Sequence, residues 1–154
     1  SVFAKLPKLL ERTGSNEHGS ITALYTVLVE GDDFNEPVSD TVRGILDGHI
    51  SLSRELAESS HYPAVDVLSS VSRIMKDIVD PKHVEAANKL QKMISVYNQS
   101  EDLINIGAYE HGTNPKLDRA IRKIDDINNF LTQGIHEKST YEETVNKMIK
   151  IASK

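Results

Sequence analysis

A tyrosine, a proline, an acid and an arginine stand close together in the middle of the chain. Tyr62 precedes Pro63, Asp66 follows, and Arg73 lies between small polar and large apolar neighbours. Proline fixes its own φ and pushes the preceding residue into an extended conformation, so the Tyr62 ring sits on stiff backbone and can stack on a flat ligand at low entropic cost. Arg73 can project a planar, permanently charged group from a packed segment. This stretch is the first candidate for binding chemistry.

Other catalytic signatures are absent from the sequence. There is no G-x-x-x-x-G-K-[ST] phosphate loop, whose N–H groups, lysine and hydroxyl hold the phosphates and magnesium of a nucleotide triphosphate. There is no G-x-S-x-G motif of a serine hydrolase. The histidines show no H-x-x-E-H or H-x-x-x-H pairing and there is no cysteine, so neither a zinc site nor a thiolate metal site is expected.

Composition limits the class of protein. The chain has 154 residues, enough for one domain or two small packed units, and at 38% hydrophobic and 27% charged residues it reads as soluble and globular. Its net charge of −5 argues against a broad nucleic-acid surface. No apolar run approaches the ~20 residues of a membrane span, and charged residues interrupt the start, so no signal peptide is expected.

The first half of the chain has the pattern of an α/β unit. Residues 1–13 predict a helix that Gly14 ends, with Pro7 as a kink or a later start, and residues 15–19 predict a loop. Residues 20–30 are nearly all apolar, as in a central strand of a parallel sheet. A loop over residues 31–37, a helix over 38–46, a strand over 49–53 and a helix over 54–59 follow, in the order typical of a parallel sheet.

The second half predicts a helical bundle. Asp80-Pro81 begins one helix, with Val84, Ala87, Leu90, Met93, Ile94 and Tyr97 on its buried face. Asn114-Pro115 begins another, which Gly134 ends, with Leu117, Ala120, Ile121, Ile124, Ile127, Phe130 and Leu131 following its periodicity. Ser139 and Glu142 predict a capping box before a last helix, whose apolar side is Tyr141, Val145, Met148, Ile149 and Ala152. The predicted domains are residues 1–80 and 81–154.

Several stretches of the sequence resemble one family. The pattern YPAVDxxxSxSRIM, from Tyr62 to Met75, is very similar to a segment late in the nucleotide-binding domain of rotary-type hexameric ATPases. Four further stretches narrow the resemblance to the flagellar and type III secretion export ATPases: residues 1–12 (SVFAKLPKLLER), 19–23 (GSITA), 30–33 (EGDD) and 43–50 (RGILDGHI). The resemblance implies the C-terminal part of a RecA-like parallel-sheet domain followed by an α-helical domain, in a fragment whose phosphate loop lies upstream.

The resemblance also implies roles for the central motif. Arg73 would reach the active site of the neighbouring subunit and stabilise charge on the γ-phosphate, whereas an arbitrary arginine more often forms a structural ion pair. Tyr62, supported by Pro63, would stack on adenine, whereas its plain alternative is a half-buried packing residue. Gln133, Gly134 and Ile135 would complete the pocket, with Tyr141 as a further possibility, in an area where the relatives use phenylalanines.

Two loops are candidates for partner contact. By resemblance, Asp32, Asp33, Asn35 and Glu36 would face a stalk protein threaded through a ring; a solvated turn that caps the next helix and a magnesium site are the alternatives. Residues 107–118 lie where the relatives carry an acidic lever against the shaft, and here only Glu110 and Asp118 are acidic. A simple helix–loop–helix connector is the alternative.

The function implied by the resemblance is ATP hydrolysis by a hexameric ring that energises protein export at the cytoplasmic base of an export apparatus, peripheral to the inner membrane. ATP and Mg²⁺ would bind the intact enzyme and not bind this fragment tightly. Expected partners are further copies of the chain, a central stalk protein, a regulatory export subunit and export chaperones. The alternatives are a catalytic subunit of a proton-translocating rotary synthase, or a non-enzymatic module that docks a stalk protein or chaperone.

Overall fold

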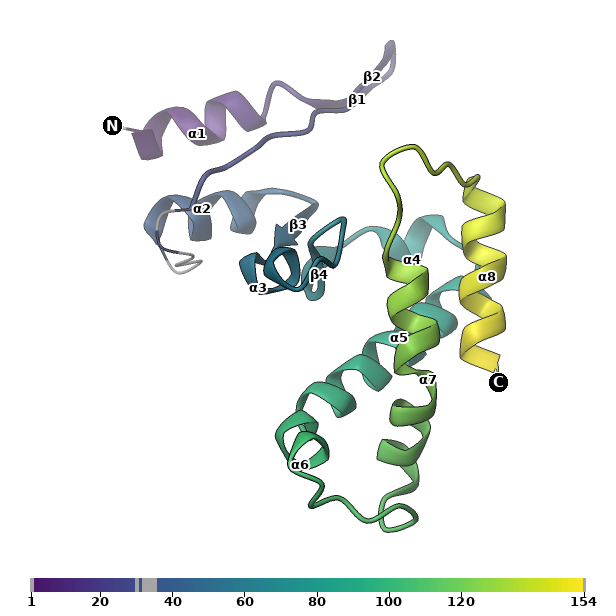
Figure 1. Cartoon of the computed structure of the whole chain (residues 1–154). Coiled ribbons are helices and arrows are strands. Elements are labelled where there is room, and N and C mark those ends of the chain that lie inside the picture. The colour runs from purple at the N-terminus through teal and green to yellow at the C-terminus, as the bar shows by residue number, and fades with distance from the viewer. Residues whose placement is uncertain (1, 30, 32–35, 154) are drawn as a thin grey trace. The chain divides into compact units, whose positions relative to one another are not determined.

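The computed structural model describes residues 2–29, 31 and 36–153. The chain forms two compact units, residues 1–49 and residues 50–154, and each is described by itself. Figure 1 shows the elements in chain order, from purple at the N-terminus to yellow at the C-terminus.

Two helices form the packed part of the first unit. α1 covers Val2–Leu10, and α2 covers Pro37–Ile45 and begins with a proline, whose fixed φ suits the first turn of a helix. The two helices pack against each other (Figure 1), and Leu10 of α1 and Val42 of α2 are buried. The helix predicted over residues 38–46 is confirmed.

A short hairpin follows α1. β1 (Gly14–Asn16) pairs antiparallel with β2 (Gly19–Ile21), and the Asn16 side chain closes the turn by accepting the N–H groups of His18 at 2.8 Å and Gly19 at 3.0 Å. The prediction that Gly14 ends the first helix and that residues 15–19 form a loop was wrong. The helix ends at Leu10, and Gly14, with φ 137°, begins a strand in a conformation that only glycine adopts readily.

The central strand predicted over residues 20–30 is present only at its start. β2 ends at Ile21, residues 22–29 lie in neither helix nor strand, and Leu24 and Leu28 are 94% and 92% exposed. A segment becomes a strand only when neighbouring strands pair with its N–H and C=O groups. Among the described residues no strand pairs with residues 22–29, so the strand predicted from their apolar composition does not form there.

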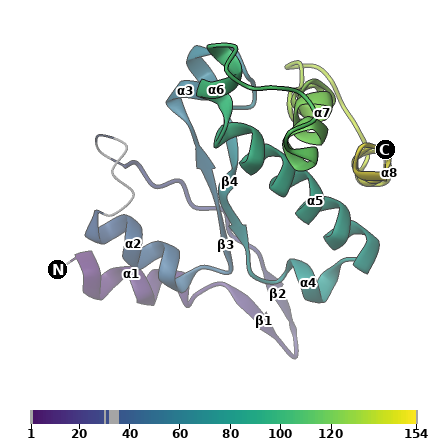
Figure 2. The same ribbon diagram turned by 90° about the horizontal axis from the view of Figure 1, so that it is seen from below.

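The next elements along the chain are a pair of strands. β3 (Gly48–Leu52) and β4 (Val65–Ser72) are hydrogen-bonded neighbours on either side of α3 (Arg54–Glu58), as Figure 2 shows. The Ser51 hydroxyl donates to the Ser69 carbonyl oxygen at 3.1 Å. Two residues after Ser51, the Ser53 N–H donates to the carbonyl oxygen of Ala64, which comes five residues before Ser69, at 2.9 Å.

As the chain advances along β3, its bonding partners come from progressively earlier positions near β4, so the two strands are antiparallel. The strand over 49–53 and the helix over 54–59 are confirmed, whereas β4 was not predicted and the parallel pairing expected from strand–helix–strand order does not occur in this pair. α3 has only five residues, or about 7 Å of helix, so it is too short to carry the chain back along β3 before β4 begins.

Helices make up the rest of the second unit. α4 covers Met75–Ile78, α5 Pro81–Asn98, α6 Glu101–Asn105, α7 Pro115–Leu131 and α8 Tyr141–Ser153. α5 packs against both α7 and α8, and α7 and α8 also touch (Figure 1). The helical bundle predicted for the second half is confirmed.

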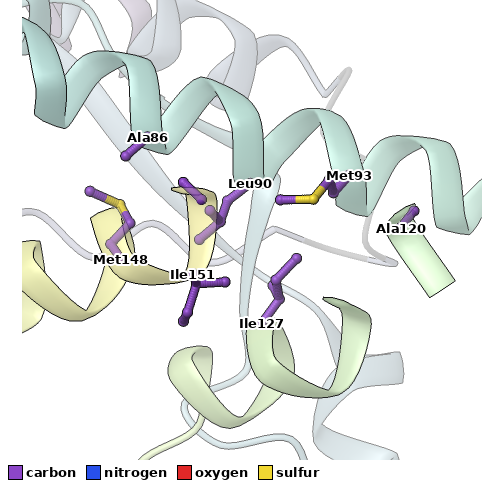
Figure 3. Packing of buried hydrophobic residues seen from close by; sticks show 8 residues of the cluster. Ala86, Leu90, Met93, Ala120, Ile127, Met148 and Ile151 are labelled. Carbon is purple, nitrogen blue, oxygen red and sulfur yellow. The ribbon is translucent and has the colours of Figure 1, made fainter. Parts of the chain in front are cut away.

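The core of the bundle lies between these three helices. Figure 3 shows side chains of α5, α7 and α8 converging, with Ile127 of α7 fully buried at 0% exposure. The buried cluster consists of Ala86, Leu90, Met93, Ala120, Ile127, Met148, Ile151 and Ala152. Tyr141, predicted on the apolar side of α8, is exposed, because the first turn of that helix extends past the cluster.

Side-chain caps fix where the helices begin. Asp80 accepts the Lys82 N–H at 2.8 Å before α5, and Asn114 accepts the Lys116 and Leu117 N–H groups before α7, as predicted. The capping box of α8 lies one residue later than expected. The Thr140 N–H donates to Glu143 Oε2 at 2.8 Å and the Glu143 N–H donates to Thr140 Oγ1 at 3.2 Å.

Candidate functional site

Tyr62 is exposed on a segment that backbone hydrogen bonds hold. The chain leaves α3 through Ser60, which has a positive φ of 62°, and the His61 N–H donates to the Leu56 carbonyl oxygen at 2.9 Å. After the cis Tyr62–Pro63 peptide, the Val65 N–H donates to the Pro63 carbonyl oxygen at 2.8 Å. The Tyr62 residue is 56% exposed, so a ring on fixed backbone faces solvent rather than filling a core.

The structure brings Tyr62 to the connection between α7 and α8. The Gln133 N–H donates to the Tyr62 carbonyl oxygen at 2.8 Å. Tyr62 and Gln133 were predicted to line one pocket, although 70 residues lie between them in the sequence. Gly134 and Ile135 follow Gln133 directly and Pro63 follows Tyr62, so all five proposed base-contacting residues lie within two positions of this hydrogen bond.

The connection itself folds into a compact turn. The Gly134 N–H donates to Glu137 Oε2 at 3.0 Å, and the Glu137 N–H donates to the Gly134 carbonyl oxygen at 3.0 Å. The Gln133 side-chain amide donates to the Glu137 carbonyl oxygen at 2.6 Å. Ile135 projects from this turn and is 97% exposed. Glu137 was not predicted from the sequence to be part of the site.

Asp66 organises the start of β4. Its Oδ1 accepts the Leu68 N–H at 2.9 Å and the Ser69 N–H at 3.1 Å, and its Oδ2 accepts the Ser69 hydroxyl at 2.5 Å. Burial raises the pKa of Asp66, but these hydrogen bonds outweigh it and the pKa is lowered overall. The acid in the central motif therefore shapes the backbone between Tyr62 and Arg73.

Two serines fasten β4 to β3. The Ser70 hydroxyl donates to the Asp66 carbonyl oxygen at 2.6 Å and accepts the Ser51 N–H at 3.0 Å, and Ser51 is buried. The side chains of Ser70 in the motif and Ser51 in β3 thus hold the two strands together. Alternation of apolar and polar residues does not reveal this, which is one reason why β4 was missed.

Arg73 follows the last residue of β4 directly and is exposed. Tyr62 lies before β4 and Arg73 after it, so the two residues are at opposite ends of the strand. At about 3.3 Å per residue, the eight residues of β4 span roughly 23 Å from the first Cα to the last. The structure therefore does not bring Arg73 and Tyr62 together.

The acidic loop before α2 is described at Gly31 and again from Glu36 onward. Asp32, Asp33 and Asn35 lie outside the described residues. Glu36 occupies the N-cap position of α2, where its side chain makes no capping hydrogen bond, while its carbonyl oxygen accepts the Asp40 N–H at 3.0 Å.

Asp118 organises the connector between α6 and α7. Although it lies in the first turn of α7, Asp118 is buried, and its carboxyl group accepts the Tyr109 hydroxyl at 2.9 Å and the Gly112 N–H at 3.1 Å and bonds His111 Nδ1. Burial raises the pKa of Asp118, but the bonds from His111, Tyr109 and Gly112 outweigh it and lower the pKa overall. Glu110, between Tyr109 and His111, is exposed on this ordered loop.

The described part of the chain shows neither a metal-binding cluster nor a membrane-spanning helix. Within residues 2–29, 31 and 36–153, no three His, Asp or Glu side chains gather in a way that could hold a metal ion. None of the helices in those ranges combines the length and apolar character that a membrane crossing needs.

Comparison with known proteins identifies the family. The nucleotide-binding domain of the ATP synthase alpha/beta family matches residues 1–72, and the type III secretion system EscN ATPase C-terminal domain matches residues 79–150. The chain is 57% identical over 145 residues to the flagellum-specific ATP synthase of Bacillus subtilis, across 94% of this chain and 33% of that protein. It belongs to the flagellar and type III secretion ATPases.

Solved structures of this ATPase family have the same fold. The assembled ATPase EscN from the enteropathogenic E. coli type III secretion system matches with a TM-score of 0.95 at 48% identity, over 98% of this chain and 37% of that chain. EscN in complex with its central stalk EscO matches with a TM-score of 0.88 at 46% identity, over 98% and 36%. The chain thus spans about a third of the length of these relatives. A nucleotide-binding domain followed by a helical domain confirms the expected fold class.

Proposed function

We propose that this chain is part of a ring-forming ATPase that hydrolyses ATP to energise protein export through a flagellar or type III secretion apparatus. The hydrogen bond from the Gln133 N–H to the Tyr62 carbonyl oxygen carries the proposal, because it joins both walls of a base site in one subunit. The relatives described above are named a flagellum-specific ATP synthase and a type III secretion system ATPase, which supports a role in the chemistry of ATP.

Tyr62 would stack on the adenine. Its ring is exposed on backbone that hydrogen bonds fix on either side, so stacking costs little conformational entropy. Pro63 stiffens this wall, and Gln133, Gly134 and Ile135 form the opposite wall. Ile135 offers an exposed apolar surface that a flat base can cover, in the area where rotary relatives use phenylalanines.

Arg73 would act on the nucleotide of the neighbouring subunit. The length of β4, roughly 23 Å, exceeds the distance between the adenine and the γ-phosphate of one ATP molecule. An arginine at the far end of the strand from Tyr62 is therefore poorly placed to reach the nucleotide that Tyr62 binds. In a ring it is available to the site next door, where a guanidinium group stabilises charge on the transferred phosphoryl group.

The phosphates and Mg²⁺ need groups that this chain does not supply. Its sequence has no phosphate loop, and the described residues form no acidic metal cluster. When bound, Mg²⁺ neutralises charge on the phosphates. The residues of this chain fit the base rather than the metal, so we expect the 154-residue chain alone to bind ATP weakly and the longer protein to hold both ATP and Mg²⁺.

Partner contacts would involve the two loops singled out in the sequence. The relative EscN was solved as an assembled ATPase and also in complex with its central stalk, which supports a homo-oligomeric ring, a hexamer in our proposal, around a stalk protein. Asp32, Asp33, Asn35 and Glu36 would face that stalk, as would Glu110 on the connector. A regulatory export subunit and export chaperones would bind at the cytoplasmic base of the apparatus, peripheral to the inner membrane.

The domain boundary belongs to the same proposal. We place it near residue 80, between a nucleotide-binding part over residues 1–80 and a helical part over residues 81–154. The match to the nucleotide-binding domain ends at residue 72 and the match to the C-terminal domain begins at residue 79. α5, the first long helix of the bundle, begins at Pro81, and both observations support this position. The compact units of the structure divide earlier, after His49, because β4 packs against α5 and is paired with β3.

Transplantation tests the proposed function. This chain would replace the corresponding segment of the flagellum-specific relative from Bacillus subtilis, and ATP turnover and mass in solution would be measured for the chimera and for the chain alone. We expect turnover by a chimera that forms rings and none by the chain. A chimera that forms rings but does not hydrolyse ATP would contradict the proposal, as would robust turnover by the repurified chain.

A further inference from the structure

One residue closes the turn between α7 and α8. Glu137 accepts the Gly134 N–H with its side chain at 3.0 Å and returns its own N–H to the Gly134 carbonyl oxygen at 3.0 Å. Its carbonyl oxygen accepts the Gln133 side-chain amide at 2.6 Å. Glu137 therefore contacts both residues that precede Ile135, without being one of the residues assigned to the base.

Gln133 is consequently held from two sides. Its N–H is bound to the Tyr62 carbonyl oxygen at 2.8 Å, and its side-chain amide is bound to the Glu137 carbonyl oxygen. A residue with both its backbone and its side chain restrained has little freedom to shift. The Tyr62 segment and the turn are thus joined through a residue whose position depends on Glu137.

Ile135 stands out from this turn with 97% of its surface exposed, although it is a large apolar residue. Burying such a side chain in a core would stabilise the fold. Because Ile135 is nevertheless exposed, we infer that the hydrogen bonds of the turn set the direction of its side chain. The bonds that do so on either side of Ile135 are those between Gly134 and Glu137.

We propose that Glu137 is a positioning residue of the nucleotide site, which fixes Ile135 opposite Tyr62 before the base arrives by holding Gly134 and Gln133. This inference rests on the proposed function and deepens it. Fixing a loop in its bound conformation improves affinity because the loop no longer has to be ordered on binding. Glu137 acts on base binding and does not reach the phosphates.

Steady-state kinetics of the ring-forming chimera test this role. Glu137→Ala removes the side-chain acceptor for the Gly134 N–H, and we expect KM for ATP to rise roughly fivefold with kcat unchanged, about the effect of one lost hydrogen bond. Glu137→Gln keeps an oxygen acceptor in the same place and should restore most of the affinity. Glu142→Ala, at an exposed glutamate in the first turn of α8, is the matched control and should leave KM unchanged.

The outcomes separate this inference from the proposed function. If Tyr62→Ala raises KM and Glu137→Ala does not, Glu137 has no positioning role although the base site stands. If neither raises KM, the base site itself is wrong. If Glu137→Ala raises KM and Glu137→Gln raises it equally, the carboxyl group acts in another way and the positioning role is refuted.

A second measurement uses the 154-residue chain without nucleotide. Amide hydrogen exchange at Gly134 should be slow in the parent chain, faster in Glu137→Ala and close to the parent in Glu137→Gln, with the amides of the bundle core unchanged. Equal exchange at Gly134 in all three would mean that Glu137 does not hold the turn, and would overturn the proposal whatever the kinetics show.

Discussion

The backbone N–H of Gln133 donates a hydrogen bond to the carbonyl oxygen of Tyr62 at 2.8 Å. The bond joins the segment before β4 to the turn after α7, two parts of the chain that are far apart in sequence. Since it uses only backbone atoms, side-chain substitutions at either position leave it intact. The roles of the Tyr62 ring and of the Gln133 side chain can therefore be tested without breaking this connection.

Replacing Tyr62 tests stacking on the base. We expect Tyr62→Ala to raise KM for ATP about tenfold or more in the ring-forming chimera, because stacking of a base on an aromatic ring contributes roughly 1–3 kcal/mol. Tyr62→Phe keeps the ring and should keep KM near the parent value. The Michaelis constant is read from steady-state turnover, and an unchanged KM in Tyr62→Ala would show that the ring does not contact the nucleotide.

Replacing Arg73 tests stabilisation of the transferred phosphate. We expect Arg73→Ala to lower kcat by about 10³-fold with a small change in KM, since an arginine that acts on the transition state contributes 10³–10⁵ in rate. Arg73→Lys should stay well below the parent, because a lysine cannot offer the paired donors of a guanidinium group. A parent-like kcat in Arg73→Ala would refute the catalytic assignment.

Mixed rings test whether Arg73 acts between subunits. Subunits with Arg73→Ala would be mixed with subunits whose phosphate loop is disabled but whose Arg73 is intact. If Arg73 acts in trans, some interfaces pair an intact phosphate site with an intact arginine, and the mixture should recover turnover that neither subunit has alone. Recovery would be absent if each subunit needed its own Arg73, and rings of one defective type serve as the baseline.

The helical half of the fold could be predicted from the sequence because its signals are local. Asp80-Pro81 and Asn114-Pro115 mark helix starts, and an apolar residue every three or four positions identified Leu90, Ala120 and Ile127 as core. The sheet could not be predicted equally well. A strand depends on partners elsewhere in the chain, so residues 22–29 have a strand composition without strand structure.

Part of the candidate site was visible in the sequence and part was not. The Tyr62-Pro63 pair and Arg73 stand out through residue type, and resemblance to the family pointed to residues 133–135. Glu137 was missed because its role depends on hydrogen bonds within a turn, which leave no periodic signal. Asp118 was noted only for its charge, whereas burial and three partners show that it orders the connector.

Two isoleucines allow stability and binding to be separated. Ile127 is fully buried between α5, α7 and α8, and Ile127→Ala should lower the free energy of unfolding by about 2–5 kcal/mol because it leaves a cavity. Ile135 is exposed, and Ile135→Ala should leave stability within about 0.5 kcal/mol but raise KM for ATP. Urea unfolding of the chain measures the first effect and kinetics of the chimera the second. A large loss of stability in Ile135→Ala would contradict the exposed position of this residue.

The connector between α6 and α7 should depend on the charge of Asp118. The pKa of this carboxyl group is lowered in the folded chain, because the bonds from His111, Tyr109 and Gly112 outweigh the opposing effect of burial. A lowered pKa means that the ionised group stabilises the fold fully above its unfolded pKa of about 3.9, and that this stability is lost as the pH falls through the lower folded pKa. At neutral pH, Asp118→Asn should therefore unfold at a lower urea concentration than the parent.

The pH series decides whether the Asp118 charge is the cause. The difference in unfolding midpoint between the parent chain and Asp118→Asn should be present at neutral pH and should be lost as the pH falls from the unfolded pKa of Asp118, about 3.9, through its lower folded pKa. Asp66 also has a lowered pKa, but it is present in both proteins and its contribution cancels. Asp125→Asn, at an exposed acid of the same helix, controls for the loss of one negative charge from α7. A difference that widens as the pH falls would mean that the ionised carboxylate opposes the fold of the connector.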